Sequence, residues 1–475
     1  MSHSATAPAI VKAKTLFSQG KAHHQQGKIS EAQSLYRQVL KLIPRQAEAL
    51  HMLGVTEFQS KNYAQAVELI SRAKSVKPDN ALIHFNLGNA LRAVGRLPEA
   101  SEAFGVALQL RPDHFEALKN LGNTYKEQNQ MDQAIACYDR LLAMSPDHPH
   151  TCYNKAIALL TQGQLAEGWD LYEYRLKCGT ADGKHVRHSI PRQALNWDGG
   201  QLKKPLLVLP EQGLGDQIFY GAMLADLQAS NVESFVCLDG RLQALFERSF
   251  PGSDFVLPTE IAGLDPGQQL FGAQIQIASL GKIFRREPAS LSRVPSTYLK
   301  ADPSLASTLR QCIRQDGKLI CGLSWSSKNP ETGASKSITL ETMRPVLQIP
   351  GIQFVDLQYG NTQDERLVIK ASTGIDIAHL DSIDNQNDID GLAALIEACD
   401  IVITVSNSTA HLSAALGKPT MILLAHHTPL WYWHLDSITS PWYSSATLLR
   451  QTEPGQWDSV VDKAALMLKG IADLV

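Results

Sequence analysis

The chain has 475 residues, a length typical of about three domains. An apolar fraction of 44% excludes a disordered chain, and a net charge of −3 without a polybasic run excludes an electrostatic nucleic-acid binder. Its seven cysteines are scattered without a Cys-x-x-Cys pair, which argues against a disulfide framework or a zinc site. Neither a secretory signal nor an apolar run near the roughly 20 residues of a membrane span is present, so we expect a soluble, cytoplasmic protein.

The first third of the sequence repeats with a period of 34 residues. Four residue columns keep this register: Gly20, Gly54, Gly88 and Gly122; Ala32, Ala66, Ala100 and Ala134; Tyr36, Ile70, Phe104 and Tyr138; and Pro44, Pro78, Pro112 and Pro146. The period and the order of the columns resemble the tetratricopeptide repeat, a pair of helices. Glycine and alanine allow the paired helices to approach closely, and proline ends the second helix.

These columns predict four full repeats and a degenerate fifth over residues 13–182, after a flexible N-terminus at 1–12. The fifth repeat has Ala156 for glycine, Gly168 for alanine, Tyr172 in place, and Thr180 where proline would fall. Each repeat leaves an apolar face bare, so neighbouring repeats must stack into a superhelix with a concave groove.

A column of asparagines lies on the first helix of three successive repeats, at Asn86, Asn120 and Asn154. An amide side chain both donates and accepts hydrogen bonds, so these residues form a candidate ladder for the backbone of an extended acceptor peptide. The alternative is ordinary solvated helix surface. Ser18 and Met52 at the same position end the ladder in the first two repeats.

After a linker at 183–204, the pattern changes to alternating strands and helices. The first series, over 205–302, has expected strands at 205–210, 234–238 and 273–277. The second, over 303–475, has expected strands at 318–325, 353–357, 401–405 and 419–424, and a last helix that either stays there or crosses back. We therefore predict an α + α/β protein with two Rossmann-like domains, whose ligands lie beyond the carboxyl ends of the strands.

Two strand-to-helix turns carry candidate chemistry. Gly213-Leu-Gly215-Asp216 follows the first strand, where two glycines let a ligand approach and Asp216 is either a general base or a helix N-cap. Ser406, Asn407, Ser408 and Thr409 follow a later strand and open a helix, an arrangement that suits phosphate. His411, on that first turn, is either a donor to phosphate or a buried histidine.

A polar loop after another strand carries Lys328 and Lys336, each a candidate to neutralise a phosphate or an ordinary surface lysine. Trp325, Trp431 and Trp433 are candidates for stacking on a base or sugar, although large aromatic residues more often fill a core. Asp388-Ile-Asp390 is an Asp-x-Asp pair, but it has the pattern of a helix N-terminus, so no metal is expected.

The motifs together resemble bacterial tetratricopeptide-repeat glycosyltransferases, which are related to the heptosyltransferases of family 9 and have the GT-B fold. Those that carry the resemblance are Trp197-Asp-Gly199, Glu211-Gln-Gly-Leu-Gly-Asp216, Asp400-Ile-Val-Ile-Thr-Val405, Ala410-His-Leu-Ser-Ala-Ala-Leu-Gly-Lys-Pro419, Ser440-Pro-Trp-Tyr443 and Trp457-Asp458. The plan is also similar to that of flagellin glycosyltransferases and O-GlcNAc transferase.

The resemblance implies that Asp216 is the catalytic base, that 406–411 binds the donor phosphate, and that Lys328 or Lys336 compensates the leaving group. Two positions depart from the relatives: Ser406-Asn407 stands where Asp-Thr is common, and Tyr432 where arginine is common. The departures leave the donor nucleotide (CMP, UDP, GDP or ADP) open.

The expected activity is metal-independent transfer of a sugar from a nucleotide-activated donor to Ser or Thr of a protein held by the repeats. The resemblance favours flagellin as acceptor and a sialic-acid-like sugar as the transferred group. Two alternatives remain: a lipopolysaccharide-type glycosyltransferase whose repeats serve assembly, and a non-catalytic scaffold that keeps the fold.

Overall fold

The computed structural model describes residues 7–178, 195–211, 213–263, 270–330, 332–427, 430–435 and 437–474. Contacts divide the chain into two compact units, Met1–Ala158 and Leu159–Val475. The expected array boundary at 182–183 and the Thr180 position lie outside the described residues. Within the described ranges, no helix has the length and apolar run of a membrane span.

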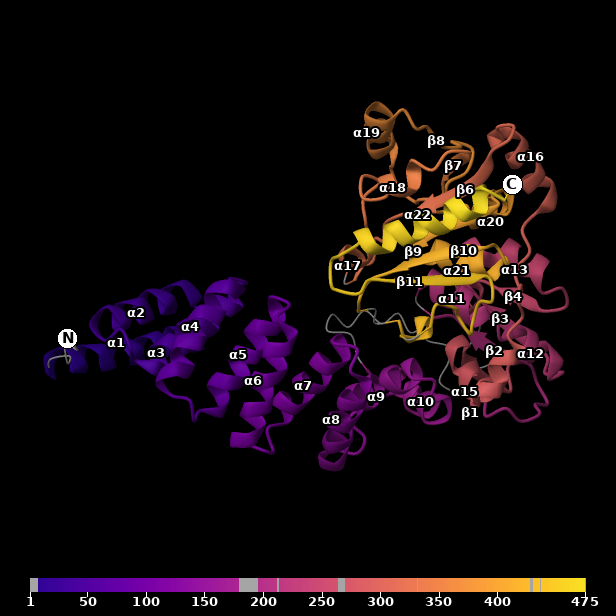
Figure 1. Cartoon of the computed structure of the whole chain (residues 1–475). Coiled ribbons are helices and arrows are strands. Elements are labelled where there is room, and N and C mark those ends of the chain that lie inside the picture. Colours follow the sequence, from indigo (N-terminus) through magenta and orange to yellow (C-terminus); the bar gives the residue numbers. More distant parts are fainter. Residues whose placement is uncertain are drawn as a thin grey trace. The chain divides into compact units, whose positions relative to one another are not determined.

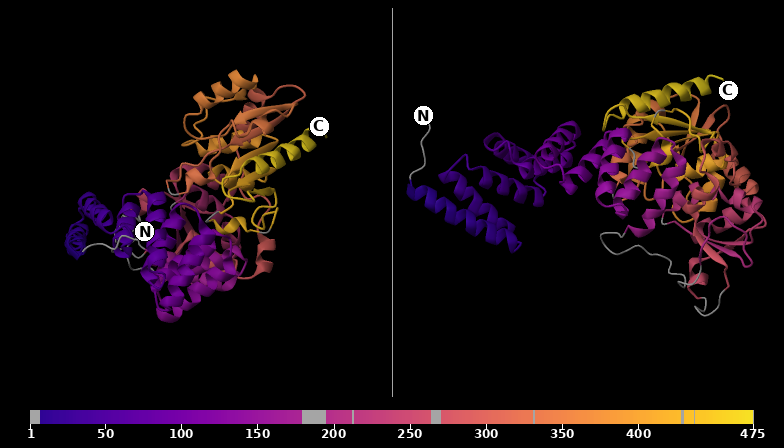
Figure 2. Two further views of the ribbon diagram at one scale, coloured as in Figure 1. Left: turned by 60° about the vertical axis from the view of Figure 1, so that its left-hand side comes forward. Right: turned by 90° about the horizontal axis from the view of Figure 1, so that it is seen from below.

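The first unit is built from helix pairs that follow one another in chain order (Figures 1 and 2). The helices are α1 (Ala7–Gln25), α2 (Ile29–Leu42), α3 (Ala47–Gln59), α4 (Tyr63–Val76), α5 (Ala81–Ala93), α6 (Leu97–Leu110), α7 (Phe115–Glu127), α8 (Met131–Met144) and α9 (Pro149–Thr161), which extends past the unit boundary. Residues 7–12, expected in a flexible N-terminus, instead belong to α1, whose first turn tolerates Pro8 because the N–H groups there have no partner in the helix.

The residue columns work as the sequence predicts. A Cβ added at Gly20, Gly54, Gly88 or Gly122 would lie 2.5–2.8 Å from the large apolar residue sixteen positions later. The four alanines of the second column are fully buried. Each second helix ends two residues before its proline. The 34-residue period is therefore confirmed as a packing period.

We expect Gly88→Ala to destabilise the array by roughly 1–3 kcal/mol, because the added methyl would lie 2.6 Å from a Phe104 ring carbon. The matched control is Gly105→Ala in α6, where an added Cβ meets nothing within 4 Å. There alanine's better helix propensity should stabilise by about 0.5–1 kcal/mol. Urea unfolding of both variants measures the contrast, and equal effects would contradict the packing role of the glycine column.

The second unit begins with two helical segments, α10 (Leu165–Tyr172) and η1 (Glu173–Lys177). A parallel sheet follows, with strand order β1-β5-β2-β3-β4. Its elements are β1 (Leu195–Asn196), β2 (Leu206–Leu209), α11 (Leu214–Gly221), α12 (Leu224–Ala229), β3 (Ser234–Cys237), η2 (Gly240–Leu242), α13 (Gln243–Ser249), β4 (Asp254–Val256), α14 (Pro258–Ala262), β5 (Ala273–Gln276), η3 (Ile277–Ser279), α15 (Leu280–Phe284) and η4 (Pro288–Arg293). The expected linker at 183–204 therefore contains strand β1, which pairs with β5.

A second parallel sheet has the order β11-β10-β9-β6-β7-β8. Its elements are α16 (Pro303–Ile313), β6 (Leu319–Ser324), α17 (Gly333–Lys336), α18 (Arg344–Leu347), β7 (Ile352–Asp356), α19 (Gln363–Thr373), β8 (Ile377–Ala378), α20 (Ile389–Ala398), β9 (Ile401–Val405), α21 (Ser408–Ala415), β10 (Thr420–Leu424), η5 (Trp431–Trp433), β11 (Ala446–Arg450) and α22 (Asp458–Ala472). The chain reverses its direction across the sheet between β6 and β9, the point at which α/β sheets bind ligands.

Helix α22 belongs to the second sheet and does not cross back. Its buried residues Val460, Val461, Ala464 and Leu468 join the same core cluster as strands β6, β7 and β9. In Figures 1 and 2 this helix lies along the orange-to-yellow part of the chain. The structure thus confirms an array of repeats followed by an α/β region with parallel sheets.

Candidate functional site

The two predicted turns meet inside the second unit. Strand β2 leads into α11 and strand β9 leads into α21, and the two helices pack against each other. At Gly215 an added Cβ would lie 3.1 Å from Cδ2 of His411, so the glycine lets the two first turns approach closely. Turns that are almost 200 residues apart in the sequence therefore form one site.

Asp216 lies in the first turn of α11 and is partly buried. Burial raises the pKa of its carboxyl group to about 6, and the nearby charge of Glu211 acts in the same direction. Lys336 and a hydrogen bond from Tyr432 partly offset this rise. Gly213 holds the N-cap position of α11, so Asp216 is not the N-cap residue. A carboxylate with a pKa near 6 has the properties of a general base at neutral pH.

The structure separates the two candidate lysines. Lys336 ends the short helix α17, is 6% exposed, and lies within electrostatic reach of Asp216. Burial lowers the pKa of its ammonium group, and Asp216 opposes that change. Lys328 is exposed, with its ammonium nitrogen 5.7 Å from the centre of the Tyr359 ring. Of the two lysines, Lys336 is therefore the one near Asp216, and its role toward a phosphate stays a prediction.

The turn at 406–409 is more enclosed than the sequence predicts. Ser406 accepts a hydrogen bond from the indole nitrogen of Trp433 at 2.8 Å. Asn407 caps α21 by accepting from the backbone nitrogen of Ala410 at 3.3 Å. Thr409 is fully buried, whereas Ser408 is partly exposed. The side chains of Ser406 and Asn407 thus have protein partners, and their role as phosphate ligands stays a prediction.

Gln358 and Asn407 clamp the turn that follows β6 from two sides. The Gln358 side-chain oxygen accepts from the Ser324 hydroxyl and from the backbone nitrogens of Trp325 and Ser326, at 2.8–3.0 Å. The Asn407 amide nitrogen donates to the Ser324 hydroxyl at 2.8 Å and to the Ser326 carbonyl at 3.0 Å. The clamp joins the ends of β7, β6 and β9 and spans the point at which the strand order reverses.

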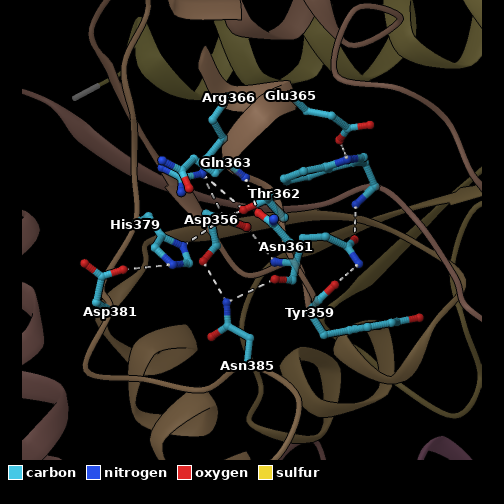
Figure 3. A network of polar contacts seen from close by, with 12 residues as sticks. Asp356, Tyr359, Asn361, Thr362, Gln363, Glu365, Arg366, His379, Asp381 and Asn385 are labelled. Atoms are coloured by element: carbon cyan, nitrogen blue, oxygen red, sulfur yellow. Dashed lines mark hydrogen bonds and ion pairs between the residues drawn. The ribbon is translucent and has the colours of Figure 1, made fainter. Parts of the chain in front are cut away.

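A buried network supports the Gln358 side of this clamp (Figure 3). Asp356, at the end of β7, is fully buried and accepts hydrogen bonds from Thr362 at 2.5 Å and from the Gln358 backbone nitrogen at 2.9 Å. His379 and Arg366 contact the same carboxylate at 2.9 and 3.3 Å. This network was not predicted from the sequence. The signal for it was the position of Asp356 at the end of a predicted strand.

His411 is a neutral, buried side chain. It is 3% exposed, its ring stacks on Trp433 at 4.9 Å, and its Nδ1 lies 3.0 Å from the Tyr443 hydroxyl. Burial, assisted by the charge of Lys336, lowers its pKa to about 3. Any bond from His411 to a phosphate would therefore come from an uncharged imidazole.

The three tryptophans proposed for stacking are all buried. The Trp325 indole nitrogen donates to Glu365 at 2.5 Å, and Trp433 bonds to Ser406. Trp431 packs edge-on against Trp169 at 5.2 Å. Their placement matches the core alternative, and stacking on a base or sugar stays a prediction.

Asp388 and Asp390 have structural partners. Asp388 caps α20 through the backbone nitrogen of Gly391 at 2.8 Å, and Asp390 pairs with Arg248. The helix N-terminus predicted there is confirmed. Among the described residues, no group of three or more His, Cys, Asp and Glu is placed to hold a metal.

In the first unit, the asparagine column links neighbouring repeats. Asn86 bonds to His51 at 2.8 Å, Asn120 donates to Asn89 at 2.7 Å, and Asn154 accepts from Lys126 at 2.7 Å. All three asparagines are partly buried, so they are more than solvated surface. A peptide in the groove would meet amides that already have partners.

Family models of the tetratricopeptide repeat match the array, and one relative matches a longer part of the chain. Residues 23–91 match one tetratricopeptide-repeat model, and residues 85–149 and 119–179 match a second. The chain is 29% identical over 337 residues to Protein FlbA of Caulobacter vibrioides, which covers 67% of this chain and 55% of FlbA. The chain thus spans about half the length of this relative. The tetratricopeptide repeats predicted from the period are confirmed.

Similar solved structures cover about a third of the chain. A crystal structure of MamA is 23% identical with a TM-score of 0.32, covering 33% of this chain and 92% of MamA. YrrB, described as a TPR protein with an unusual peptide-binding site, is 17% identical with a TM-score of 0.34, covering 37% of this chain and 93% of YrrB.

Proposed function

We propose that the second unit transfers a sugar from a nucleotide-activated donor to a hydroxyl of a protein acceptor. The observation that carries the proposal is the meeting of three groups at one junction: Asp216, Lys336 and the first turn of α21. A base, a buried cation and a helix N-terminus are what transfer from a phosphate ester requires. The resemblance to GT-B glycosyltransferases supports the same activity.

In the proposed reaction, Asp216 takes the proton of an acceptor Ser or Thr hydroxyl. The hydroxyl oxygen then forms a bond to the anomeric carbon of the sugar, and the bond from that carbon to the phosphate oxygen breaks. The nucleotide leaves with the electron pair of that bond. The ammonium of Lys336 and the N-terminal turn of α21 stabilise the added negative charge on its phosphate, and no metal is invoked in this step.

We expect Lys336→Met to weaken nucleotide binding about ten- to a hundredfold, the range for a lost charge-assisted hydrogen bond. Lys328→Met is the matched control and should change affinity less than about threefold, because its ammonium lies over Tyr359. Calorimetry first identifies which of CMP, UDP, GDP and ADP binds the parent chain. The affinities of the two lysine variants for that nucleotide are then compared. Equal losses would remove Lys336 from its proposed role.

The non-catalytic scaffold is a second candidate, favoured by one observation. Trp433 and Tyr443 already bond to Ser406 and His411 on the turn proposed for phosphate. If none of the four nucleotides binds the parent chain, this alternative replaces the enzyme. A lipopolysaccharide-type acceptor is distinguished from a protein acceptor by which of them gains the sugar.

We infer that the repeats hold the acceptor, with flagellin and a sialic-acid-like sugar as the preferred pair by resemblance. Recognition by the groove would bring the acceptor to this protein independently of the donor.

A further inference from the structure

The second helix of the degenerate fifth repeat is a structural part of the α/β unit. Trp169 of α10 is fully buried, and an added Cβ at Gly281 would lie 2.3 Å from its ring. The hydroxyls of Tyr172 and Tyr220 are 2.9 Å apart, so α10 is also bonded to α11, the helix of Asp216. Helix α10, which belongs to the second unit, therefore lies against the helix that carries Asp216.

Arg175, on η1, is the charged group of this contact that pairs with Glu211, whereas Asp170 of α10 pairs with Lys282 and Arg286. Its side chain is 9% exposed. The guanidinium donates to Glu211 at 2.9 Å, to Glu173 at 2.8 Å and to the Ser279 hydroxyl at 2.9 Å. A buried arginine held by two carboxylates and a hydroxyl has one defined position.

Glu211 connects this ion pair to the candidate base. It lies between β2 and α11, five residues before Asp216. Its backbone carbonyl accepts from the Gln217 side chain at 2.7 Å, and the Gln217 oxygen accepts from the backbone nitrogen of Asp239 at 2.9 Å. The turn that carries Asp216 is thus fixed by Gln217 on one side and by Arg175 on the other.

We propose that Arg175 is a positioning residue for Asp216, through which segment η1 holds and neutralises Glu211 near the candidate base. The role of Asp216 as a base rests on the proposed function, but the coupling of Arg175, Glu211 and Asp216 does not. Segment η1 of the second unit would then contribute to the reaction centre.

The charges around Asp216 determine whether loss of Arg175 raises or lowers the pKa of Asp216. The titratable and charged groups that act on Asp216, or are acted on by it, are Glu211, Lys336, Tyr432, Tyr220 and Tyr443, with neutral His411 near Gly215. Without Arg175 the Glu211 carboxylate would lose its paired cation, and its repulsion of an ionised Asp216 would increase. Asp216 would then hold its proton to a higher pH and serve less well at neutral pH.

A double-mutant cycle tests this coupling. The pH dependence of kcat/KM is measured for the parent, Arg175→Met, Glu211→Gln and the double variant. We expect the acid-limb midpoint to rise by on the order of one pH unit in Arg175→Met and to fall in Glu211→Gln. The double variant should lie between them. A purely structural arginine would lower activity without moving the midpoint.

A second readout needs no turnover. For each variant, a second protein is made that also carries Asp216→Asn. The difference between the two melting temperatures is measured from pH 4 to pH 8. This difference reports the titration of Asp216 itself, because only one member of each pair has the carboxyl group. If the titration midpoint of Asp216 moves but the chain has no transfer activity, the coupling of Arg175, Glu211 and Asp216 is supported and the proposed enzymatic function is rejected. If Arg175→Met does not fold, the fall of the midpoint expected in Glu211→Gln decides. Unchanged midpoints in the folded variants would overturn the proposal.

Discussion

Asp216→Asn should lower the rate of sugar transfer about 10²- to 10⁴-fold, the usual loss for one general base, while nucleotide affinity stays within about threefold. Asparagine keeps the shape and can still accept the hydrogen bond from Tyr432, but it cannot take a proton. Steady-state kinetics and calorimetry measure the two quantities. A variant with unchanged turnover would reject Asp216 as the base.

The same variant should be more stable than the parent at neutral pH. Because the pKa of Asp216 rises from the ordinary 3.8 to about 6, the folded state holds an extra proton between these values. The free energy of unfolding therefore falls as pH rises through this window and then stays level. With partial exposure taken into account, Asp216→Asn should gain roughly 1–3 kcal/mol at pH 7.5 and little at pH 4.

The raised pKa of Asp216 also predicts how the rate of transfer depends on pH. Activity should rise with pH through a midpoint near 6 and reach a plateau above it, since the base must be ionised. His411 contributes no limb near pH 6.5, because its pKa is lowered to about 3. An acid limb that persists in Asp216→Asn would assign it to another group.

Replacing Asn86, Asn120 and Asn154 together by alanine should weaken acceptor binding about thirtyfold or more. Three hydrogen bonds at about 0.5–1.5 kcal/mol each amount to roughly 2–4 kcal/mol if all are engaged by the acceptor. The structure adds a second effect, because each asparagine also bonds to a neighbouring repeat. The array should therefore lose stability as well.

The control for this triple variant carries three exposed amides of the second helices, Gln38, Gln109 and Gln133, changed to alanine. It should bind the acceptor like the parent and unfold at nearly the same denaturant concentration. Pull-down of flagellin, the preferred acceptor, is performed under conditions in which circular dichroism shows that both variants are fully folded. Equal recovery by both triple variants would mean that the asparagines serve only to join repeats.

Features that follow a repeat period, a strand-to-helix turn or a continuous apolar run could be predicted from the sequence. Gly88 and Phe104 touch as their spacing implies, and Asp216 and His411 lie on first turns that meet. The long apolar strands β6, β9 and β10 were predicted within two residues at either end because they are buried on both faces.

Features that depend on long-range packing could not be predicted. Strands β1 and β8 have two residues each, too few for a pattern. Strand β11 ends the second sheet next to a polar stretch and carries no turn signal of its own. In the sequence Tyr432 is only a departure from the relatives, whereas in the structure its side chain is hydrogen-bonded to Asp216. The Arg175–Glu211 pair joins residues 36 apart without a motif.

Intact-mass spectrometry of flagellin incubated with the full chain and a panel of CMP-, UDP-, GDP- and ADP-linked sugars tests the central claim most directly. We predict that one nucleotide class supports a mass gain of one sugar per modified Ser or Thr, with release of the nucleotide in equal amount, and that Asp216→Asn shows neither. Unchanged flagellin mass with every donor, together with no nucleotide binding by calorimetry, would contradict the account.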